Sequence, residues 1–359
     1  MKKGLILITV GFLLIILSFF GFKSLVGQND FKKEEIKSAA LEALKDEEKY
    51  KEEVKNLLVA GGDVIPSRWV GVKIRRSGDS AMPFRKIAPL MQSGDITFVN
   101  FEAPFLDKGE LVTEGMSFKA EPDFIEGLIL AGVDVVSLAN NHMKNQGREG
   151  LAFTFSHLTE NNIKYTGAGK NYEKAHKGVI LESKNIKFGF LAYTYSDGIK
   201  FSKNEDPEIY DLAFMEIDRM KEDVEKLKKE ADVVIVSMHA GTEYQVTPNP
   251  QQVEFAHAAI DSGANLVLGH HPHWVQTTEK YKDSFIIYSL GNLVFDQMWS
   301  EETREGVIAK CKFQGMKLKS MEFVPTKIED YSQPRFATRQ ESKIILKRME
   351  LKSAVVNLE

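Results

Sequence analysis

The chain has 359 residues, of which 43% are apolar and 27% charged, a globular composition that excludes wholesale disorder. Its 47 basic residues are set against 51 acidic ones, giving a formal net charge of −4 and no electrostatic signature of nucleic-acid binding. The one cysteine, Cys311, excludes a disulfide framework, a cysteine-ligated zinc site and an iron–sulfur cluster. Any metal must therefore be held by histidine, carboxylate and amide groups.

An uninterrupted apolar run covers residues 4–22, directly after Lys2 and Lys3. A membrane-spanning helix needs about 20 apolar residues, whereas the apolar part of a cleaved signal peptide usually has only about 7–15. We therefore expect residues 1–22 to be an uncleaved transmembrane signal-anchor. A removed signal peptide and a buried helix of a soluble domain are the alternatives. The two lysines predict a cytoplasmic N-terminus, which makes the protein single-pass in the cell membrane with its domain extracytoplasmic.

The rest of the chain divides by composition into three parts. Residues 23–56 are dense in Glu and Lys and keep apolar residues near helical spacing, which predicts a solvated, charged helical stalk. Residues 57–330 alternate short apolar runs with amphipathic segments and are expected to form one α/β domain. Residues 331–359 are expected to be a polar C-terminal tail.

Within the domain, the apolar runs predict strands that are covered on both faces. These strands are expected at residues 57–60, 96–101, 133–140, 233–238, 265–269 and 285–290. Helix-like stretches lie between them, at residues 121–131, 147–161, 211–230 and 249–262. Hairpins are expected at 184–185 and between 307–313 and 317–328, so the sheets should be mixed.

Nearly every expected strand ends in side chains that can bind metal or move protons. They are Asp63, Asn100, Glu102, Asn140 to His142, His239, Glu243, His270, His271, His273, Asn292 and Asp296. In open α/β sheets, ligands bind at the carboxyl ends of the strands. We therefore expect these groups to converge on one polar cluster.

Such a cluster suits a binuclear metal site. An all nitrogen and oxygen ligand set fits Mn, Fe or Zn, and a carboxylate such as Asp63 or Glu102 can bridge two ions about 3.5–4 Å apart. His271 and His273 flank Pro272, so a fixed backbone could aim both imidazoles at neighbouring sites. Each residue taken alone has a structural alternative, such as a turn, a helix cap or a buried core histidine, and the hypothesis depends on the whole set.

The order of these motifs resembles the CapA/PgsA family of bacterial poly-γ-glutamate capsule biosynthesis. The motifs are Gly62-Asp63, Asn100 to Pro104, Ala139 to His142, His239 to Tyr244, Gly269 to His273 and Ser289 to Gln297. That family is similar to the calcineurin-like metallophosphoesterases. The resemblance implies a four-layer α-β-β-α sandwich of metallophosphoesterase type, preceded here by the N-terminal transmembrane helix.

The resemblance also implies roles for individual residues. Asp63, Glu102, Asn141, His239, His271 and His273 match metal ligands, and His142 matches the neighbouring catalytic acid. Residues expected to contact substrate are Arg68, Asn100, Glu243, His270 and Asn292. Two departures stand out: the phosphoesterase Asp-x-His motif reads Asp63-Val64-Ile65 here, and its second Gly-Asp motif is replaced by Glu102. His270 is an additional imidazole that could substitute as a ligand or be a neighbour.

Two functions are consistent with this sequence. The first is a membrane-anchored component of poly-γ-glutamate synthesis or export that binds the anionic polymer and membrane synthase subunits, with a divalent metal site of two ions. The alternative is a metal-dependent hydrolase, a phosphoesterase or an amidase-like enzyme, at the cell surface. The missing imidazole favours a binding role, and the retained Asn141-His142 pair favours catalysis. Whether the protein is an enzyme therefore stays open at this point.

Overall fold

The computed structural model describes residues 37, 40–41, 49–51, 53–195 and 211–358. Its contacts divide the chain into two units, Met1–Val54 and Lys55–Glu359. In the first unit, the described residues before Val54 are helical, within the stretch expected to be a stalk. Among the described residues no helix is both long and apolar enough to cross a membrane, and the expected anchor, residues 1–22, lies outside them.

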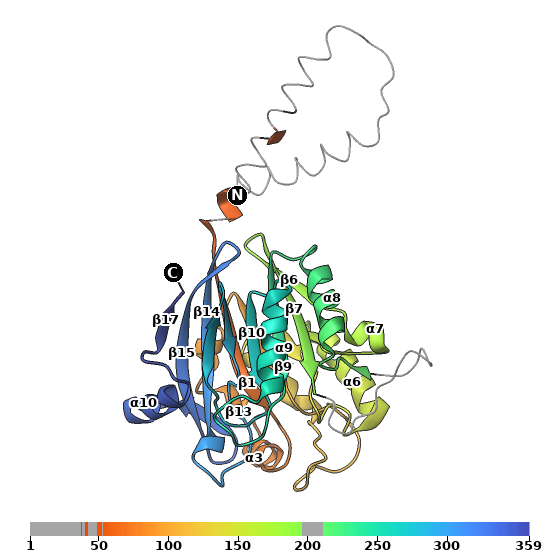
Figure 1. The fold of residues 1–359 in the computed structure, drawn as a ribbon. Helices are drawn as coiled ribbons and strands as arrows, with labels where there is room; N and C mark the ends of the chain where they lie inside the picture. The colour runs from red at the N-terminus through yellow and green to blue at the C-terminus, as the bar shows by residue number, and fades with distance from the viewer. Residues whose placement is uncertain (1–36, 38–39, 42–48, 52, 196–210, 359) are drawn as a thin grey trace, which may run out of the picture. The chain divides into compact units, whose positions relative to one another are not determined.

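The second unit contains two main sheets, and β1 (Lys55–Val64) lies in the middle of the larger one (Figure 1). On one side β1 pairs in parallel with β2 (Ile96–Phe101), followed by β3 (Val135–Ser137) and β4 (Lys164–Thr166). On the other side it pairs antiparallel with β14 (Glu305–Gln314), followed by β15 (Lys317–Glu329) and β16 (Gln333–Phe336). Two short strands complete this sheet, β13 (Asn292–Val294) against β1 and β17 (Val355–Asn357) against β15.

The smaller sheet has a parallel centre and antiparallel edges. In order, its strands are β11 (Thr278–Tyr281), β12 (Ser284–Ile287), β10 (Leu266–His270), β9 (Val233–His239), β7 (Ile186–Thr194) and β6 (Val179–Ser183). Lys184 and Asn185 connect β6 and β7 with φ of 49° and 66°, as a two-residue hairpin turn requires. A separate two-stranded pair joins β5 (Ala168–Gly169) and β8 (Asp211–Leu212). The expected hairpins and mixed sheets are confirmed.

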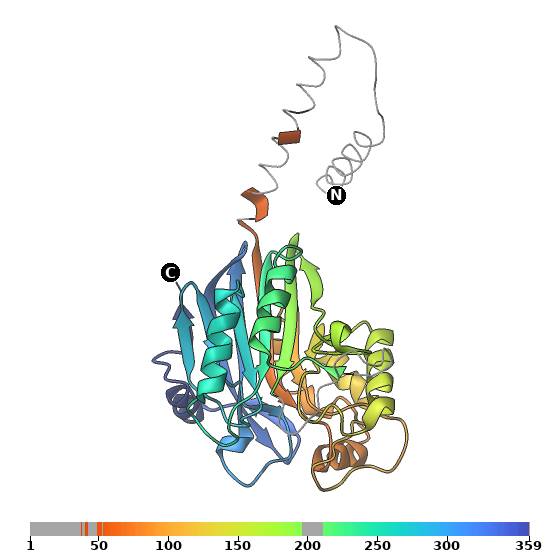
Figure 2. The ribbon, with the colours of Figure 1, turned by 45° about the vertical axis from the view of Figure 1, so that its right-hand side comes forward.

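Helices cover the outer faces of the two sheets. Figure 2 shows α8 (Ile217–Leu227) and α9 (Pro250–Asp261) side by side on the smaller sheet, where they pack on Val234, Val236 and Val267. A second core lies against Val59, Val99 and Val136 of the larger sheet. The helices there are α3 (Trp69–Ser77), η1 (Met82–Phe84), α4 (Ala88–Met91), η2 (Pro122–Phe124), α5 (Ile125–Leu130) and α6 (Gly147–Glu160). Shorter elements are α7 (Tyr172–Ala175) and η3 (Glu302–Arg304).

Aromatic side chains pack between the two sheets. Phe98 of β2 stacks on Phe190 of β7 with ring centroids 5.9 Å apart, and Phe188 meets Phe313 edge to face at 5.3 Å. Successive strand residues face opposite sides, so Val99 contacts the helices while Phe98 contacts the other sheet. Strands buried on both faces explain the apolar runs of the sequence, and the mixed α/β class is confirmed.

The C-terminal segment differs from the expected polar tail. Residues 331–358 contain β16, α10 (Arg339–Arg348) and β17, and all three contact β15. Thr338 begins α10 with a capping box, since its side chain accepts from Glu341 N while the Glu341 side chain accepts from Thr338 N. The segment is polar because it covers the edge of a long strand rather than a core face.

Two glycines bring strands close together just before candidate site residues. A Cβ at Gly269 would lie 1.9 Å from the Tyr288 carbonyl oxygen, and one at Gly62 would lie 2.0 Å from the Gly291 carbonyl oxygen. Backbone cannot move aside as the end of a flexible side chain can. The glycines of the Gly62-Asp63 and Gly269-His270 motifs therefore set the spacing on which the following side chains depend.

We expect Gly269→Ala to destabilise the protein by about 3 kcal/mol or more, because the new methyl group would overlap backbone in a packed core. The measurement is the free energy of unfolding in urea. Gly78→Ala is the control: its Cβ would meet nothing within 4 Å, so only the left-handed φ of 67° opposes it, at about 1 kcal/mol. Equal losses in the two variants would contradict this account of Gly269.

Candidate metal centre

The polar residues at the strand ends meet where the two sheets come together. In the larger sheet Asp63 is in register with Asn100 of β2 and Asn292 of β13. In the smaller sheet His270 is in register with His239. The strand ends of the two sheets are in contact, because the His270 Nδ1 atom lies 3.3 Å from the Asp63 Oδ1 atom. The polar groups that the sequence predicts to converge on one cluster lie together in the structure.

Two groups of side chains could each hold a metal ion. Glu102, His239 and His271 form one, and Asp63, Glu102 and His273 form the other. Within each group the ligand atoms lie within 4.8 Å of one another, and all five residues are buried. Glu102 belongs to both groups, which is the position a bridging carboxylate would take.

Asn141 adds an oxygen ligand to the first group. Its Oδ1 atom lies 2.9 Å from the His239 Nε2 atom. The neighbouring Asn140 points elsewhere, since its Nδ2 donates to the Phe101 carbonyl at 2.9 Å. The six residues that match metal ligands by motif are therefore all present at this cluster.

The atoms left without hydrogen bonds also fit a metal. The buried Glu102 Oε1 and His271 Nδ1 atoms have no hydrogen-bond partner among the described residues. Buried polar atoms without partners are rare in proteins and usually mark a missing ion, water or ligand. A set of carboxylate, amide and imidazole groups with unused lone pairs is suited to a divalent cation such as Mn, Fe or Zn.

The two buried carboxylates are driven apart in pKa. Burial by itself would raise the pKa of Asp63, but the neighbouring imidazoles of His270 and His273 hold it well below its usual value. Burial, together with the negative charges of Asp63 and Glu243, holds the pKa of Glu102 well above its usual value. Two carboxylates this close cannot both stay ionised without compensating positive charge.

The imidazoles are in the form that binds metal. Burial lowers the pKa of His239 well below its usual value, and the neighbouring His271 lowers it further. Burial, aided by His273, lowers the pKa of His271 to about 3. Both rings are therefore neutral at physiological pH, and only a neutral imidazole offers a lone pair to a cation.

Three residues expected to contact substrate are fully buried against the ligands. Asn100 Nδ2 lies 2.8 Å from Asp63 Oδ1, 3.2 Å from Glu102 Oε2 and 3.3 Å from His239 Nδ1. The Asn292 Oδ1 atom lies 2.9 Å from His273 Nδ1, and His270 contacts Asp63. Their exposed fraction is 0%, the same as that of Asp63, Glu102 and His239. Residues that contact the ligand side chains in this way fix the orientation of metal ligands.

Asn292 also determines which nitrogen of His273 is available. Its Nδ2 donates to the carbonyl oxygens of Thr303 at 2.8 Å and His273 at 3.3 Å, so its Oδ1 must be the atom that faces the His273 ring. His273 therefore donates from Nδ1, and its Nε2 keeps the lone pair.

The loop that carries His271 and His273 has an unusual backbone. These residues have φ of 97° and 57°, a region that L-residues adopt only when the surroundings enforce it. The His271 N–H donates to Asp63 Oδ2 at 3.2 Å, and the Tyr244 N–H donates to the Pro272 carbonyl at 2.9 Å. These two hydrogen bonds hold the loop so that both imidazoles face the carboxylates.

His142 lies beside the two ligand groups. Its Nδ1 contacts Asn145 Oδ1 at 2.9 Å, and since that oxygen also accepts from Phe118 N, His142 donates from Nδ1. Its Nε2 lies 4.0 Å from Glu102 Oε1. The ring stacks on Phe118 with centroids 4.0 Å apart, and burial lowers its pKa. Asn145 was not predicted, although its position three residues after His142 is a signal that the sequence offered.

Arg68 and Glu243 lie farther out than the ligands. Arg68 forms an ion pair with Asp296, and its guanidinium lies 5.0 Å from the ring centroids of Phe118 and Phe295. Asp296, one of the strand-end groups noted in the sequence, accepts from two of its nitrogens, so Arg68 is not a free cation. Glu243 is half-buried.

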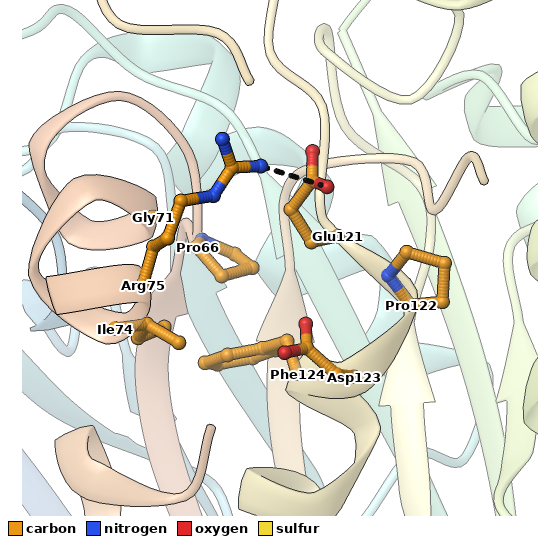
Figure 3. A pocket seen from close by; sticks show the side chains of 8 residues that line it. All are labelled: Pro66, Gly71, Ile74, Arg75, Glu121, Pro122, Asp123 and Phe124. Atoms are coloured by element: carbon orange, nitrogen blue, oxygen red, sulfur yellow. Dashed lines mark ion pairs between the residues drawn. The ribbon is translucent and has the colours of Figure 1, made fainter. Parts of the chain in front are cut away.

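A separate cavity of about 300 Å³ lies beside this region (Figure 3). Its lining residues are Pro66, Gly71, Ile74, Arg75, Glu121, Pro122, Asp123 and Phe124, and none of the candidate ligands is among them. Arg75 faces Glu121 across it, with Nη2 and Oε2 3.5 Å apart. Because Arg75 pairs with Glu121 and Asp123 accepts from Ser80 Oγ, we assign this cavity no role in the metal centre.

We expect the full-length protein to contain a divalent metal that His271→Ala/His273→Ala removes, because one ligand is lost from each group. Elemental analysis of the purified proteins measures this. His157→Ala is the matched control, since His157 contacts only the Pro122 carbonyl and neighbouring phenylalanine rings. An equal metal content in the double variant and the wild type, with the fold intact by circular dichroism, would contradict the assignment.

Comparison with known proteins gives the family. Residues 57–297 match the model of a family described as bacterial capsule synthesis protein PGA_cap. Among curated relatives, the capsule biosynthesis protein CapA of Bacillus anthracis is 30% identical over 293 residues, which are 79% of this chain and 70% of that protein. The PGA biosynthesis protein CapA of Bacillus subtilis is 29% identical over 260 residues, 69% of this chain and 65% of that protein.

Among solved structures, the calcineurin-like phosphoesterase YfkN of Bacillus subtilis aligns with 83% of this chain and 97% of its own, with a TM-score of 0.49 and 14% identity. Nothing about function follows from a likeness at this level. The family model and the CapA relatives agree with the family that the sequence motifs indicated. This chain therefore belongs to the bacterial capsule synthesis protein PGA_cap family, the family of the CapA proteins.

Proposed function

We propose that this protein is a membrane-anchored, extracytoplasmic component of poly-γ-glutamate capsule synthesis or export, and that it handles the polymer at a metal centre. The observation that carries the proposal is the pair of buried ligand groups that share Glu102. All five residues of these groups fall within residues 57–297, the part of the chain that the family model matches. The names of the CapA relatives support the capsule role.

The finer fold assignment is part of the proposal. We assign the domain to the four-layer sandwich of metallophosphoesterase type. Two sheets packed face to face, with helices on their outer faces, support it. So does the position of the ligands, which lie at or just after the carboxyl ends of β1, β2, β9 and β10. Ile65 stands where the phosphoesterase Asp-x-His motif has its histidine, and Glu102 replaces the second Gly-Asp motif, so this chain differs from that type at these two positions.

We assign two divalent ions to the centre. Asp63, Glu102 and His273 would hold one, and Glu102, Asn141, His239 and His271 the other. When bound, such cations polarise a carbonyl or phosphoryl oxygen and make water more acidic. The chain itself supplies the orientation of the ligands through Asn100 and Asn292.

Charge supports a role for the cation in polymer binding. Asp63, Glu102 and Glu243 make the site acidic, and Arg68 is paired with Asp296. Poly-γ-glutamate has a carboxylate on every unit, and an acidic site without a cation would repel it. Bound divalent ions reverse the local sign of charge, so the polymer and the metal would bind together.

The membrane location rests on the sequence alone. Residues 4–22 are apolar and follow Lys2 and Lys3, which supports a single-pass anchor with the domain outside. This position would place the metal centre on the side where a capsule polymer emerges. Membrane synthase subunits are the partners that we propose for the anchor and the stalk.

In an organism that makes the polymer, deletion of the gene should abolish surface γ-glutamyl polymer, because the anchored domain is required for its assembly. Complementation with the full chain should restore it, and His157→Ala should restore it equally. The His271→Ala/His273→Ala chain should not. Surface polymer is measured immunochemically, and an unchanged amount after deletion would refute the proposal.

A metal-dependent hydrolase is the second candidate, and the position of His142 favours it. Its Nε2 lies 4.0 Å from Glu102 Oε1 while Nδ1 is held by Asn145, so Nε2 is the nitrogen placed to exchange a proton with a group bound at the centre. The bonds that would be cleaved are phosphoesters or γ-glutamyl amides.

With Mn²⁺ present, the full chain should hydrolyse a phosphodiester or a γ-glutamyl peptide if this second function holds. His142→Ala should lower turnover by about 10²–10⁴-fold, the usual contribution of a general acid or base, and leave the metal content unchanged. His257→Ala, whose imidazole contacts Glu279 instead, is the control. Full metal content with no turnover on either substrate would exclude the hydrolase.

A further inference from the structure

Exposed apolar side chains border the metal centre on two sides. Trp299 is 60% exposed and Met116 is 56% exposed, the two highest values among large apolar side chains in the described part of the chain. Trp299 packs edge to face on Tyr244 at 4.8 Å, and Tyr244 lies 6.4 Å from the His273 ring. Apolar surface exposed beside a polar site is typical of ligand contact.

Tyr244 is fixed between the metal loop and Trp299. Its backbone N–H donates to the Pro272 carbonyl, and it has a φ of 61°. Its hydroxyl accepts from Gln297 Nε2 at 3.1 Å and is hydrogen-bonded with the Glu243 carboxylate. Because a carboxylate only accepts, the hydroxyl proton goes to Glu243 and the amide N–H of Gln297 goes to the hydroxyl.

These hydrogen bonds from Gln297 to Tyr244 and from Tyr244 to Glu243 leave one acceptor atom of Gln297 unused. The amide orientation directs Gln297 Nε2 at Tyr244, and Gln297 Oε1 has no hydrogen-bond partner among the described residues although the side chain is only 8% exposed. The buried Trp274 Nε1, on a ring 6.4 Å from Tyr244, is likewise a donor without a partner in the described structure. A ligand that offers an N–H beside the Tyr244 hydroxyl would satisfy Gln297 Oε1.

We propose that Trp299, Tyr244 and Gln297 form a subsite that binds a backbone amide of the polymer next to the metal centre. This inference rests on the proposed function and names the part of the substrate that is recognised. An amide is flat, which suits the indole face of Trp299, and it carries an N–H donor for Gln297 Oε1. A phosphate ester or a carboxylate offers Gln297 no donor, and Glu243 would repel its charge.

The experiment compares two polyanions of equal carboxylate number: a γ-linked glutamate oligomer, which contains amides, and polyacrylate, which contains none. Affinities are measured by titration calorimetry with the full-length protein in Mn²⁺. The variants are Trp299→Ala and Gln297→Met. Met316→Ala is the control, since Met316 is 50% exposed in the β14–β15 turn, at the end of the sheet opposite to Asp63.

The wild type should bind the γ-glutamyl oligomer at least about tenfold more tightly than polyacrylate. Each variant should lose that preference and keep its metal content and its polyacrylate affinity, and Met316→Ala should keep the preference. An undiminished preference in both variants, or an equal loss for both polymers, would overturn the subsite and leave the proposed function intact. A metal-loaded wild type that binds neither polymer would overturn both. Tighter binding of a nucleotide, lost in Trp299→Ala, would reassign the subsite to base stacking.

Discussion

Burial of two carboxylates within one small volume governs this molecule. Asp63 and Glu102 have no exposed surface, and each raises the cost of ionising the other. Nearby groups resolve only half of the conflict: the imidazoles of His270 and His273 stabilise the charge of Asp63, while one Glu102 oxygen has no hydrogen-bond partner in the part of the chain that the structure describes. A cation shared through Glu102 would satisfy both carboxylates at once.

The scaffold meets this requirement with rigid elements. The ligands lie at strand ends of two different sheets, and glycines at positions 62 and 269 allow the backbones that precede them to approach closely. The left-handed backbone at His271 and His273 brings their imidazoles to the carboxylates, held by hydrogen bonds to Asp63 and Tyr244. Loss of this local conformation would separate the ligands without unfolding the sheets, so metal affinity and global stability can be altered separately.

The strands, their polar ends and the hairpins could be predicted, because burial on both faces leaves apolar runs and hairpin turns leave Lys-Asn or Gly signals. The sequence alone could not predict which polar residues would be ligands and which would only contact the ligands. Asn100, Asn292 and His270 look like substrate contacts in the sequence, and their hydrogen bonds and contacts with the ligands depend on packing between distant segments. The partnership of Arg68 with Asp296, 228 residues away, and the packing of residues 331–358 on β15 are equally non-local.

The pairing of β1 has a consequence for the order in which the protein can be completed. Asp63 is made early, yet its register partner Asn292 and the neighbouring strand β14 are synthesised more than half a chain length later. Contacts so far apart in sequence form slowly. Until they form, an incomplete β1 presents an unpaired edge, and none of the shared cation sites exists. Loading of the proposed ions would thus be a late step of maturation, available only once nearly the whole domain has left the ribosome.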